Sequence, residues 1–397
     1  MAEDPITVVA GHLCLDVLPQ ILARTPEEFR ASFGPARLMF VGPVTFSTGG
    51  AVSNTGIALH KLGIPVRLIG KIGDDMFGQV VRQVLASFDG KLADGLIVDP
   101  QVSTSYTVII NPPGIDRYLL NCPGTNDTFR ADDVCFDGLA GMRLFHFGYP
   151  SVMREMYADD GAQTVELFRR AKETGATTSL DMAYPDLNSP AGRVNWPAIL
   201  PVLLPYVDVF LPSIEETLAM LRRDTLAALR TEAGDGDILP LITPRLLSDI
   251  SEELLDLGVK VVALKMGYRG LYVRTAGRKA IEAMGRARPS DPAGWADQEL
   301  WTACFNVKLA GAAGAGDSTI AGFLAGLLRD MSLVEATTTA VAVGACNVEA
   351  ADTLSGVRSW DETLRRVAVG WPRHDLQIEA PGWRFDAAAG LWRGGQR

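Results

Sequence analysis

Short apolar runs alternate with amphipathic segments along most of this chain. The runs that predict buried strands lie at residues 6–13, 144–147, 178–182, 207–211, 259–264 and 271–274. Hydrophobic positions recur at helical spacing in 153–174 and 214–223, directly after two of these runs. Strands that alternate with helices are typical of a mostly parallel central sheet covered by helices. The pattern therefore predicts an α/β fold.

Two β-rich stretches, near residues 14–48 and 103–123, interrupt this alternation. The first contains several prolines and few helix signals, and its apolar positions predict strands at 38–41 and 44–46. In the second, a turn at 111–116 separates two half-alternating strands, which predicts a hairpin. A small exposed sheet has edges and an apolar face that need cover.

The remaining irregular segments are the region 275–300 and the tail. Residues 275–300 are rich in Gly, Pro, Ala and charged residues, which predicts a loop insertion. The tail carries Trp371, Trp383 and Trp392 among Pro, Gly and Arg, and we predict an ordered surface extension. The expected organisation is one large domain over 1–370 and a C-terminal extension over 371–397.

Composition narrows the functional classes. The chain carries a formal net charge of −10, whereas a nucleic-acid-binding surface needs a basic patch. Its five cysteines are scattered without a C-x-x-C pair, which predicts free thiols in a reducing compartment rather than disulfides or a zinc site. No apolar run approaches membrane-spanning length, and the first residues lack a secretory signal pattern. We therefore expect a cytoplasmic protein that binds neither nucleic acid nor membrane.

Candidate chemistry is concentrated in the segment 311–324, GAAGAGDSTIAGFL, where small residues lead to Asp317 and a helix-like pattern. The glycines allow the backbone N–H groups of Gly314, Ala315 and Gly316 to point at one anion, and the helix dipole favours phosphate there. An acid beside an anion site makes sense if Asp317 accepts the proton of a hydroxyl that attacks phosphorus. The alternative is a helix packed on a sheet, with Asp317 as a partner of the helix dipole.

Two common nucleotide-binding patterns do not fit this segment. In the Walker spacing, Asp317 occupies the position of the lysine that reaches the terminal phosphates. The G-x-G-x-x-G spacing of dinucleotide-binding proteins also fails. A Walker-type NTPase and a Rossmann-type oxidoreductase are therefore disfavoured.

A second glycine-containing region changes the interpretation. Residues 49–63, GGAVSNTGIALHKLG, predict a glycine turn and a helix of small residues, and 66–78 predict a buried strand and a Gly-Asp-Asp turn. Together with the Asp317 segment, these residues resemble the two signature regions of the pfkB family of carbohydrate kinases, which have the ribokinase-like fold. The resemblance extends from residue 8 to about residue 356. It implies that the two β-rich stretches form a small lid, which often pairs with the lid of a second subunit in a homodimer.

The resemblance also implies an activity and a sugar site. The expected reaction is ATP- and Mg²⁺-dependent phosphorylation of a hydroxyl group of a sugar, sugar acid or related small alcohol, with Asp317 as base. The implied substrate-binding residues are Asp16, Gly49, Gly50, Asn54 and Asn126. The alternative for Asp16 is a turn or cap residue, and we favour the ligand role because Gly11 is nearby. The alternative for Asn54 is a helix N-cap, which is compatible with sugar binding.

On the nucleotide side, the resemblance implies ATP contacts from Lys265, Gly267, Gly270 and Asn347. Glu216 would serve Mg²⁺, although Ser213 replaces the asparagine of the family's N-x-x-E motif. Arg117 is a candidate for contact with an acidic group of the substrate, or a solvated strand charge. Two alternatives to a sugar kinase remain at this point, a nucleoside kinase with Tyr106 or Phe147 against the base, and a non-catalytic sugar or nucleotide sensor.

Overall fold

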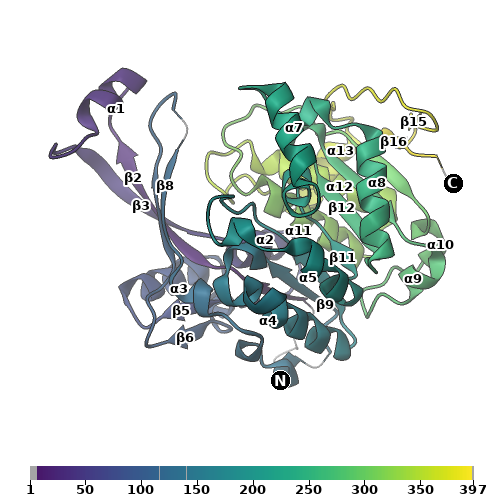
Figure 1. Ribbon diagram of the computed structural model, residues 1–397, viewed down its shortest axis with the longest axis horizontal. Coiled ribbons are helices and arrows are strands. Elements are labelled where there is room, and N and C mark those ends of the chain that lie inside the picture. Colours follow the sequence, from purple (N-terminus) through teal and green to yellow (C-terminus); the bar gives the residue numbers. More distant parts are fainter. Residues whose placement is uncertain (1–6, 116, 140, 396–397) are drawn as a thin grey trace.

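The computed structural model describes residues 7–115, 117–139 and 141–395, and these contain a ten-stranded sheet and a four-stranded sheet (Figure 1). The order of the large sheet is β15-β16-β14-β13-β12-β11-β10-β9-β1-β4. Its strands, in chain order, are β1 (Thr7–Gly11), β4 (Val66–Ile69), β9 (Leu144–Gly148), β10 (Thr177–Asp181), β11 (Val209–Phe210), β12 (Val261–Lys265), β13 (Leu271–Thr275), β14 (Glu299–Thr302), β15 (Arg384–Asp386) and β16 (Leu391–Arg393). The strands from β12 to β4 pair in parallel, and the other four are antiparallel additions at one edge. The predicted mostly parallel sheet is confirmed.

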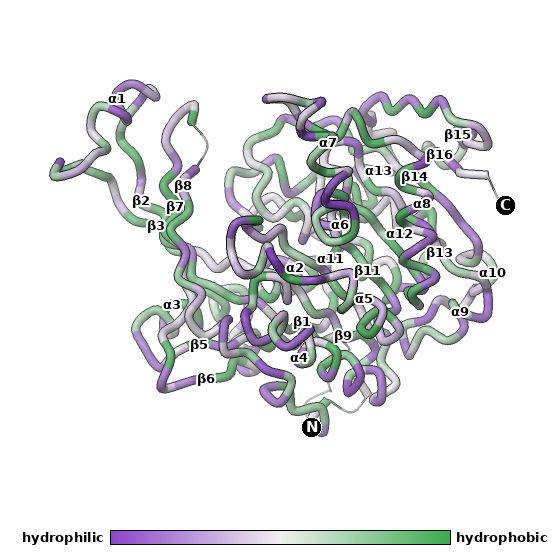
Figure 2. Tube along the Cα trace, viewed as in Figure 1, coloured by the Kyte–Doolittle hydropathy of each residue, from purple (hydrophilic) through white to green (hydrophobic). Residues whose placement is uncertain are grey.

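Helices cover both faces of this sheet. Strand side chains alternate between two cores: Val261 and Ala263 of β12 enter one, and Val262 and Leu264 enter the other. In Figure 2, hydrophobic residues, coloured green, follow the central strands and the helices beside them. The helices are α1 (Pro26–Ser32), α2 (Ala51–Lys61), α3 (Met76–Phe88), α4 (Arg154–Glu173, interrupted at 158–161), α5 (Trp196–Leu203), α6 (Ile214–Leu221), α7 (Arg223–Ala233), α8 (Pro244–Asp256), α9 (Arg278–Glu282), α10 (Pro292–Trp295), α11 (Ala315–Leu328), α12 (Leu333–Asn347) and α13 (Trp360–Ala368).

The four-stranded sheet is the predicted lid, and it projects as an arm from the body (Figure 1). Its order is β3-β2-β7-β8, with β2 (Cys14–Ile21), β3 (Val41–Gly49), β7 (Tyr106–Ile110) and β8 (Tyr118–Cys122). The hairpin expected around 111–116 is the antiparallel β7–β8 pair, although residue 116 lies outside the described residues. A short pair, β5 (Lys71–Gly73) with β6 (Ile97–Asp99), completes the strands of the described chain.

Three local expectations were wrong. The first lid stretch contains the helix α1, which begins with Thr25 as N-cap, Pro26 at the first position and two glutamates in the first turn. The predicted strand at 38–41 begins only at Val41, and it continues through 44–46 as the single strand β3. The region 275–300 is not simply a loop, because it holds α9 and α10 and leads into β14.

The tail is part of the large sheet rather than an extension on its surface. β16 pairs with β14, and β15 pairs with β16. Trp392 lies in β16 opposite Trp301, and Trp371 stacks on Phe305 with 4.5 Å between ring centres. The main domain therefore continues past residue 370, because β15 and β16 extend the large sheet at its edge.

Two further sequence expectations have clear outcomes. All five cysteines are free, as predicted. Within the described ranges, no helix combines the length and the apolar character needed to cross a membrane.

Candidate active site

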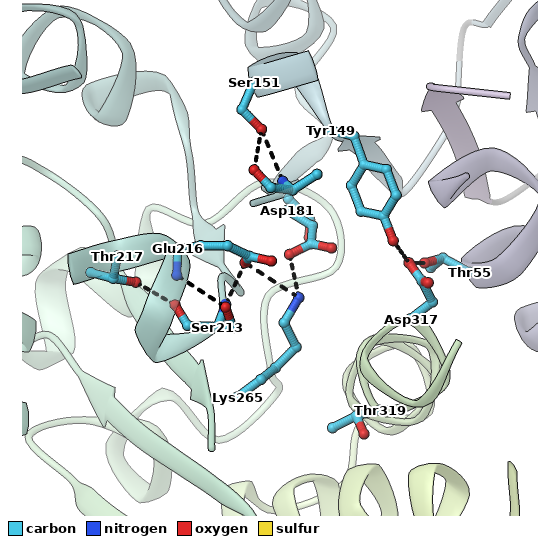
Figure 3. A network of polar contacts seen from close by, with 12 residues as sticks. Thr55, Tyr149, Ser151, Asp181, Ser213, Glu216, Thr217, Lys265, Asp317 and Thr319 are labelled. Atoms are coloured by element: carbon cyan, nitrogen blue, oxygen red, sulfur yellow. Dashed lines mark hydrogen bonds and ion pairs between the residues drawn. The ribbon is translucent and has the colours of Figure 1, made fainter. Parts of the chain in front are cut away.

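The parallel strands of the large sheet end at one edge, and the predicted site lies there. Asp181 is the last residue of β10, Lys265 the last of β12, and Tyr149 directly follows β9. In open α/β sheets, ligands bind outside the carboxyl ends of the strands. The fold therefore brings residues from distant parts of the sequence to one place (Figure 3).

The predicted phosphate loop is the N-terminus of α11. Gly314 is its N-cap in the left-handed conformation, with φ 72°, and a Cβ there would lie 2.7 Å from the carbonyl oxygen of Thr353. The N–H of Ala315 donates to the carbonyl of Ala312 at 3.3 Å. Within the described chain, the N–H groups of Gly314 and Gly316 have no hydrogen-bond partner. The predicted three-donor anion site is thus a two-donor site in this conformation, with the helix dipole behind it.

Asp317 lies in the first turn of α11 and is only 5% exposed. Three side chains donate hydrogen bonds to its carboxylate, as Figure 3 shows for two of them. Tyr149 donates to Oδ1 at 2.7 Å, Thr55 to Oδ1 at 3.3 Å and Asn54 to Oδ2 at 3.1 Å. These donors come from β9 and α2, so Asp317 has a fixed orientation and is more than a partner of its own helix dipole.

Lys265 lies beside this helix end with two acids. Its Nζ is 2.5 Å from Asp181 Oδ1 and 4.0 Å from Glu216 Oε2 (Figure 3). A Cβ on Gly316 would lie 3.4 Å from Cδ of Lys265, so the lysine side chain runs past the first turn of α11. Burial alone lowers the pKa of Lys265, but the two carboxylates outweigh it and the net shift is upward. The ammonium group therefore stays charged next to the helix N-terminus, an arrangement that favours phosphate.

Glu216 has a structural role that the sequence did not predict. Its N–H donates to Ser213 Oγ at 3.1 Å, and its Oε2 accepts from the Ser213 N–H at 2.6 Å, so the two residues form a capping box for α6. Ser213 is therefore the N-cap of α6. In the described chain no group of three or more His, Cys, Asp or Glu side chains is arranged as a metal cage. Mg²⁺ does not require one, because one or two carboxylates with substrate phosphates usually bind it.

The lid carries a polar row that begins at Asp16. Strand register places Asp16 beside Ser47 of β3 and Thr107 of β7, and Thr107 beside Asn121 of β8. These four side chains share one face of the lid, since directly paired residues point to the same side. The neighbouring row, Phe46, Val17, Val108 and Leu120, is apolar and lies on the opposite face. Sequence reasoning found only Asp16 in the polar row.

Gly49 is necessary for the position of Asp16. A Cβ at residue 49 would lie 2.6 Å from Asp16 Oδ2, closer than any side chain permits. Burial raises the pKa of Asp16 to about 6, against opposing effects of Cys14 and Arg117. A half-buried carboxylate that is not neutralised by an ion pair is a suitable acceptor for hydroxyl groups.

The three predicted asparagines differ in what they contact. Asn54 lies inside α2, whose N-cap is Gly50, so the N-cap alternative is wrong. Its Nδ2 holds Asp317, and its buried Oδ1 has no partner among the described residues. Asn126 is fully buried and pairs both amide atoms with the main chain of Leu13. Asn347 donates to the carbonyl of Ala313 and so fixes the loop before α11.

The other predicted residues are placed as follows. Gly267 and Gly270 form the turn between β12 and β13, directly after Lys265. Asp75, in the predicted Gly-Asp-Asp turn, caps α3 by accepting from the Gly78 N–H at 2.8 Å. Phe147 belongs to the buried core, and Arg117 is exposed in the lid.

Sequence reasoning missed four residues of the site. Tyr149, Thr55 and Asp181 contact Asp317 or Lys265, and His12 lies 6.0 Å from the Tyr149 ring. Burial lowers the pKa of His12 to about 4, so its imidazole is neutral, and its Nδ1 has no described partner. Three of them share a signal of position, since Tyr149, Asp181 and His12 each lie near the end of a predicted strand, whereas Thr55 lies in α2.

Comparison with known proteins agrees with this geometry. The sequence pattern described as pfkB family carbohydrate kinase matches residues 21–360. The chain belongs to the pfkB family of carbohydrate kinases. It is 30% identical over 202 residues to the probable fructokinase-4 of Arabidopsis thaliana, which covers 49% of this chain and 54% of that protein.

Solved structures share the fold. Arabidopsis thaliana ribokinase in complex with ribose and ATP superposes with a TM-score of 0.67 at 17% identity, covering 91% of this chain and 98% of that one. A putative ribokinase II from E. coli, in complex with ATP and Mg²⁺, gives a TM-score of 0.65 at 18% identity and covers 92% and 99% of the two chains. This pfkB protein is a sugar kinase with a ribokinase-like fold and a separate lid sheet.

Proposed function

We propose that this pfkB kinase transfers the γ-phosphoryl group of ATP to a hydroxyl group of a sugar, sugar acid or related small alcohol. The observation that carries the proposal is the position of Asp317 in the first turn of α11. Its buried carboxylate lies beside two unpaired N–H groups and the Lys265 ammonium. A hydroxyl bound to Asp317 would therefore lie next to a site that favours phosphate.

In this mechanism Asp317 is the general base. The acceptor oxygen attacks the γ-phosphorus, the bond from that phosphorus to the bridging oxygen of ADP breaks, and Asp317 receives the hydroxyl proton. The N–H groups of Gly314 and Gly316, together with Lys265, stabilise the charge on the transferring group. The Ala315 N–H joins them only if its 3.3 Å bond to Ala312 opens.

The lid and α2 would hold the acceptor. The lid presents a polar row of four side chains, Asp16, Ser47, Thr107 and Asn121. Asn54 Oδ1, which has no partner among the described residues, can accept a further hydrogen bond from the substrate. Gly49 brings the backbone between the lid and α2 close to Asp16, and Gly50 brings it close to His12. Polar groups of this kind suit a polyol better than a nucleobase, because each hydroxyl group finds a partner. We give Asn126 no direct contact, since it is fully buried and both of its amide atoms bond the main chain of Leu13.

ATP would extend from Lys265 toward Gly267, Gly270 and Asn347, all at the same sheet edge. Mg²⁺ fits the pair Asp181 and Glu216, because Asp181 Oδ2 is buried without a described partner and hard oxygen ligands suit this ion. When bound, the ion would supply positive charge to the phosphates.

We further propose a homodimer through the lid. Apolar lid side chains are exposed, including Phe40 just before β3 and Val44, Phe46 and Leu120 on the face opposite Asp16. Within the described chain, the edge strands β3 and β8 are unpaired on their outer sides. Large exposed apolar side chains gathered on one small sheet mark an interaction site. A second lid has the matching chemistry.

The test is ADP release with Mg²⁺ and ATP across a panel of sugars, sugar acids and nucleosides. We expect turnover with at least one sugar-like acceptor, and loss of that turnover in Asp317→Asn. Turnover only with nucleosides would replace the acceptor class. No turnover with any acceptor, while ATP and a sugar still bind, would favour a sensor over a kinase.

A further inference from the structure

We propose that Tyr149 is a positioning residue for the general base, because its hydroxyl group fixes one oxygen of Asp317 and leaves the other to receive the acceptor proton. The inference rests on the proposed function and deepens it. Tyr149 lies in neither of the two sequence motifs of the family. Tyr149 reaches the site from the end of β9. It lies on one side of Asp317, and the helix α11 that carries Asp317 lies on the other (Figure 3).

The argument begins with the hydrogen-bond capacity of the carboxylate. An ionised carboxylate offers about four acceptor positions, two on each oxygen. Oδ1 accepts from Tyr149 at 2.7 Å and from Thr55 at 3.3 Å, so both of its positions are used. Oδ2 accepts only from Asn54, at 3.1 Å, among the described residues. One position on Oδ2 is therefore left for the acceptor hydroxyl.

The backbone around Tyr149 holds the ring in place. Tyr149 has φ 70° and ψ 36°, a left-handed conformation that is rare for a bulky residue and persists only where the surroundings impose it. Its N–H donates to the carbonyl of Asp181 at 3.1 Å. Two residues later, Ser151 Oγ donates to the carbonyl of Ala183 at 2.7 Å and accepts from the Ala183 N–H at 2.9 Å. The turn after β9 is thus fastened to the end of β10.

The protonation state of Tyr149 suits a donor. Burial raises the pKa of the phenol well above its ordinary value, and the charges of Asp317 and Asp181 raise it further. The hydroxyl therefore keeps its proton and does not compete with Asp317 as a base. Its contact is shorter than those of Thr55 and Asn54, as expected for a phenol bonded to a carboxylate.

The test is Tyr149→Phe, which keeps the ring and removes the hydroxyl. We expect kcat to fall on the order of ten- to a hundredfold, because a misplaced reacting group loses rate, while KM for ATP and for the acceptor change less than about twofold. Tyr272→Phe is the matched control. Tyr272 is also buried, and its hydroxyl contacts Ser251 at 2.9 Å and Glu299 at 2.7 Å, yet it lies in β13 away from Asp317. Its kcat should stay within about twofold of the wild type.

A double-mutant cycle separates positioning from general damage. In an Asp317→Asn background, Tyr149→Phe should change the residual rate by less than about twofold, because both residues act through one carboxylate. A wild-type kcat in Tyr149→Phe would overturn the proposal. The same loss in both backgrounds would also overturn it.

The hydrogen bond itself can be tested without any acceptor. The urea midpoint of unfolding is measured for Tyr149→Phe in the wild-type and Asp317→Ala backgrounds. We expect a lower midpoint in the first background and a smaller change in the second, since the partner is already absent. Equal changes would contradict the contact even in an active enzyme. A wild type that phosphorylates no acceptor would instead overturn the proposed function, and the midpoints would still report the bond.

Discussion

The lid and the surroundings of Asp317 are built in opposite ways. The lid is a small sheet with a polar row that begins at Asp16 on one face and exposed apolar side chains, including Phe46 and Leu120, on the other. Asp317 is buried and receives hydrogen bonds from Tyr149, which follows β9, and from Thr55 and Asn54 of α2. In the proposed mechanism, the buried region positions the base and the lid contacts the acceptor.

Loss of the base should give the largest effect. Asp317→Asn keeps the size and one acceptor oxygen of the side chain, so the fold and ATP binding should be retained. We expect kcat to fall by about 10²–10⁴, the range for general-base catalysis. Phosphotransfer is measured at saturating substrates, with ATP binding by calorimetry as the control. An activity within threefold of the wild type would remove Asp317 from its assigned role.

A substitution that displaces Asp16 in the lid should give a smaller effect than loss of the base, and the effect should be on acceptor binding. Gly49→Ala adds a Cβ that would lie 2.6 Å from Asp16 Oδ2, so the Asp16 carboxylate must shift. We expect the acceptor KM to rise by about 10- to 100-fold while KM for ATP holds. Gly34→Ala is the matched lid control, because its Cβ would meet only the side chain of Arg37 at 3.7 Å. Equal effects of the two substitutions would contradict the role of Gly49.

The pH dependence of acceptor binding should report Asp16. Burial raises its pKa to about 6, so the carboxylate becomes protonated as the pH falls through that value. If the ionised form accepts the substrate hydroxyls, affinity should weaken by up to about tenfold per pH unit below pH 6. The measurement is calorimetry with Asp317→Asn, which removes titration of the base. The side chain of Asp16→Asn cannot ionise, so this variant should bind the acceptor weakly and with an affinity that does not change with pH. If its affinity still falls below pH 6 as in the parent protein, Asp16 is not the origin of the pH dependence.

Breaking the lid contact should have the smallest effect on the chemical step. Phe40 is 76% exposed in the lid, and Val369 is 78% exposed outside it. Phe40→Asp should convert the proposed dimer into a monomer, because a charge in an apolar interface is costly. Val369→Asp should leave the mass unchanged, and light scattering distinguishes the two. A dimer that survives Phe40→Asp, Phe46→Asp and Leu120→Asp would place the interface elsewhere.

Much of the fold follows from periodicity in the sequence. The central strands are continuous apolar runs because both of their faces are covered, so their signal is strong. The helix α1 was missed although Thr25, Pro26 and two glutamates are a start signal, because nearby prolines dominated the interpretation. The strands β14, β15 and β16 are short, and their place in the sheet depends on distant partners that composition does not reveal.

The site was predictable where a motif carries it. Asp317, Gly314 and Gly316 lie in one local segment whose glycines and acid have a direct chemical meaning. Tyr149 has no such signal, because it becomes relevant only when β9 and α11 meet. Asn126 shows the reverse case, since a motif suggested substrate contact and the structure uses its amide to hold the main chain of Leu13.

The most direct test of the central claim is ³¹P NMR of the complete reaction of the wild-type protein with ATP, Mg²⁺ and the acceptor found in the panel. The account predicts a phosphate monoester of the acceptor in equal amount to ADP, with little inorganic phosphate. It also predicts no comparable product in Asp317→Asn. ADP accompanied only by inorganic phosphate would contradict the account, because water rather than a substrate hydroxyl would then be the acceptor.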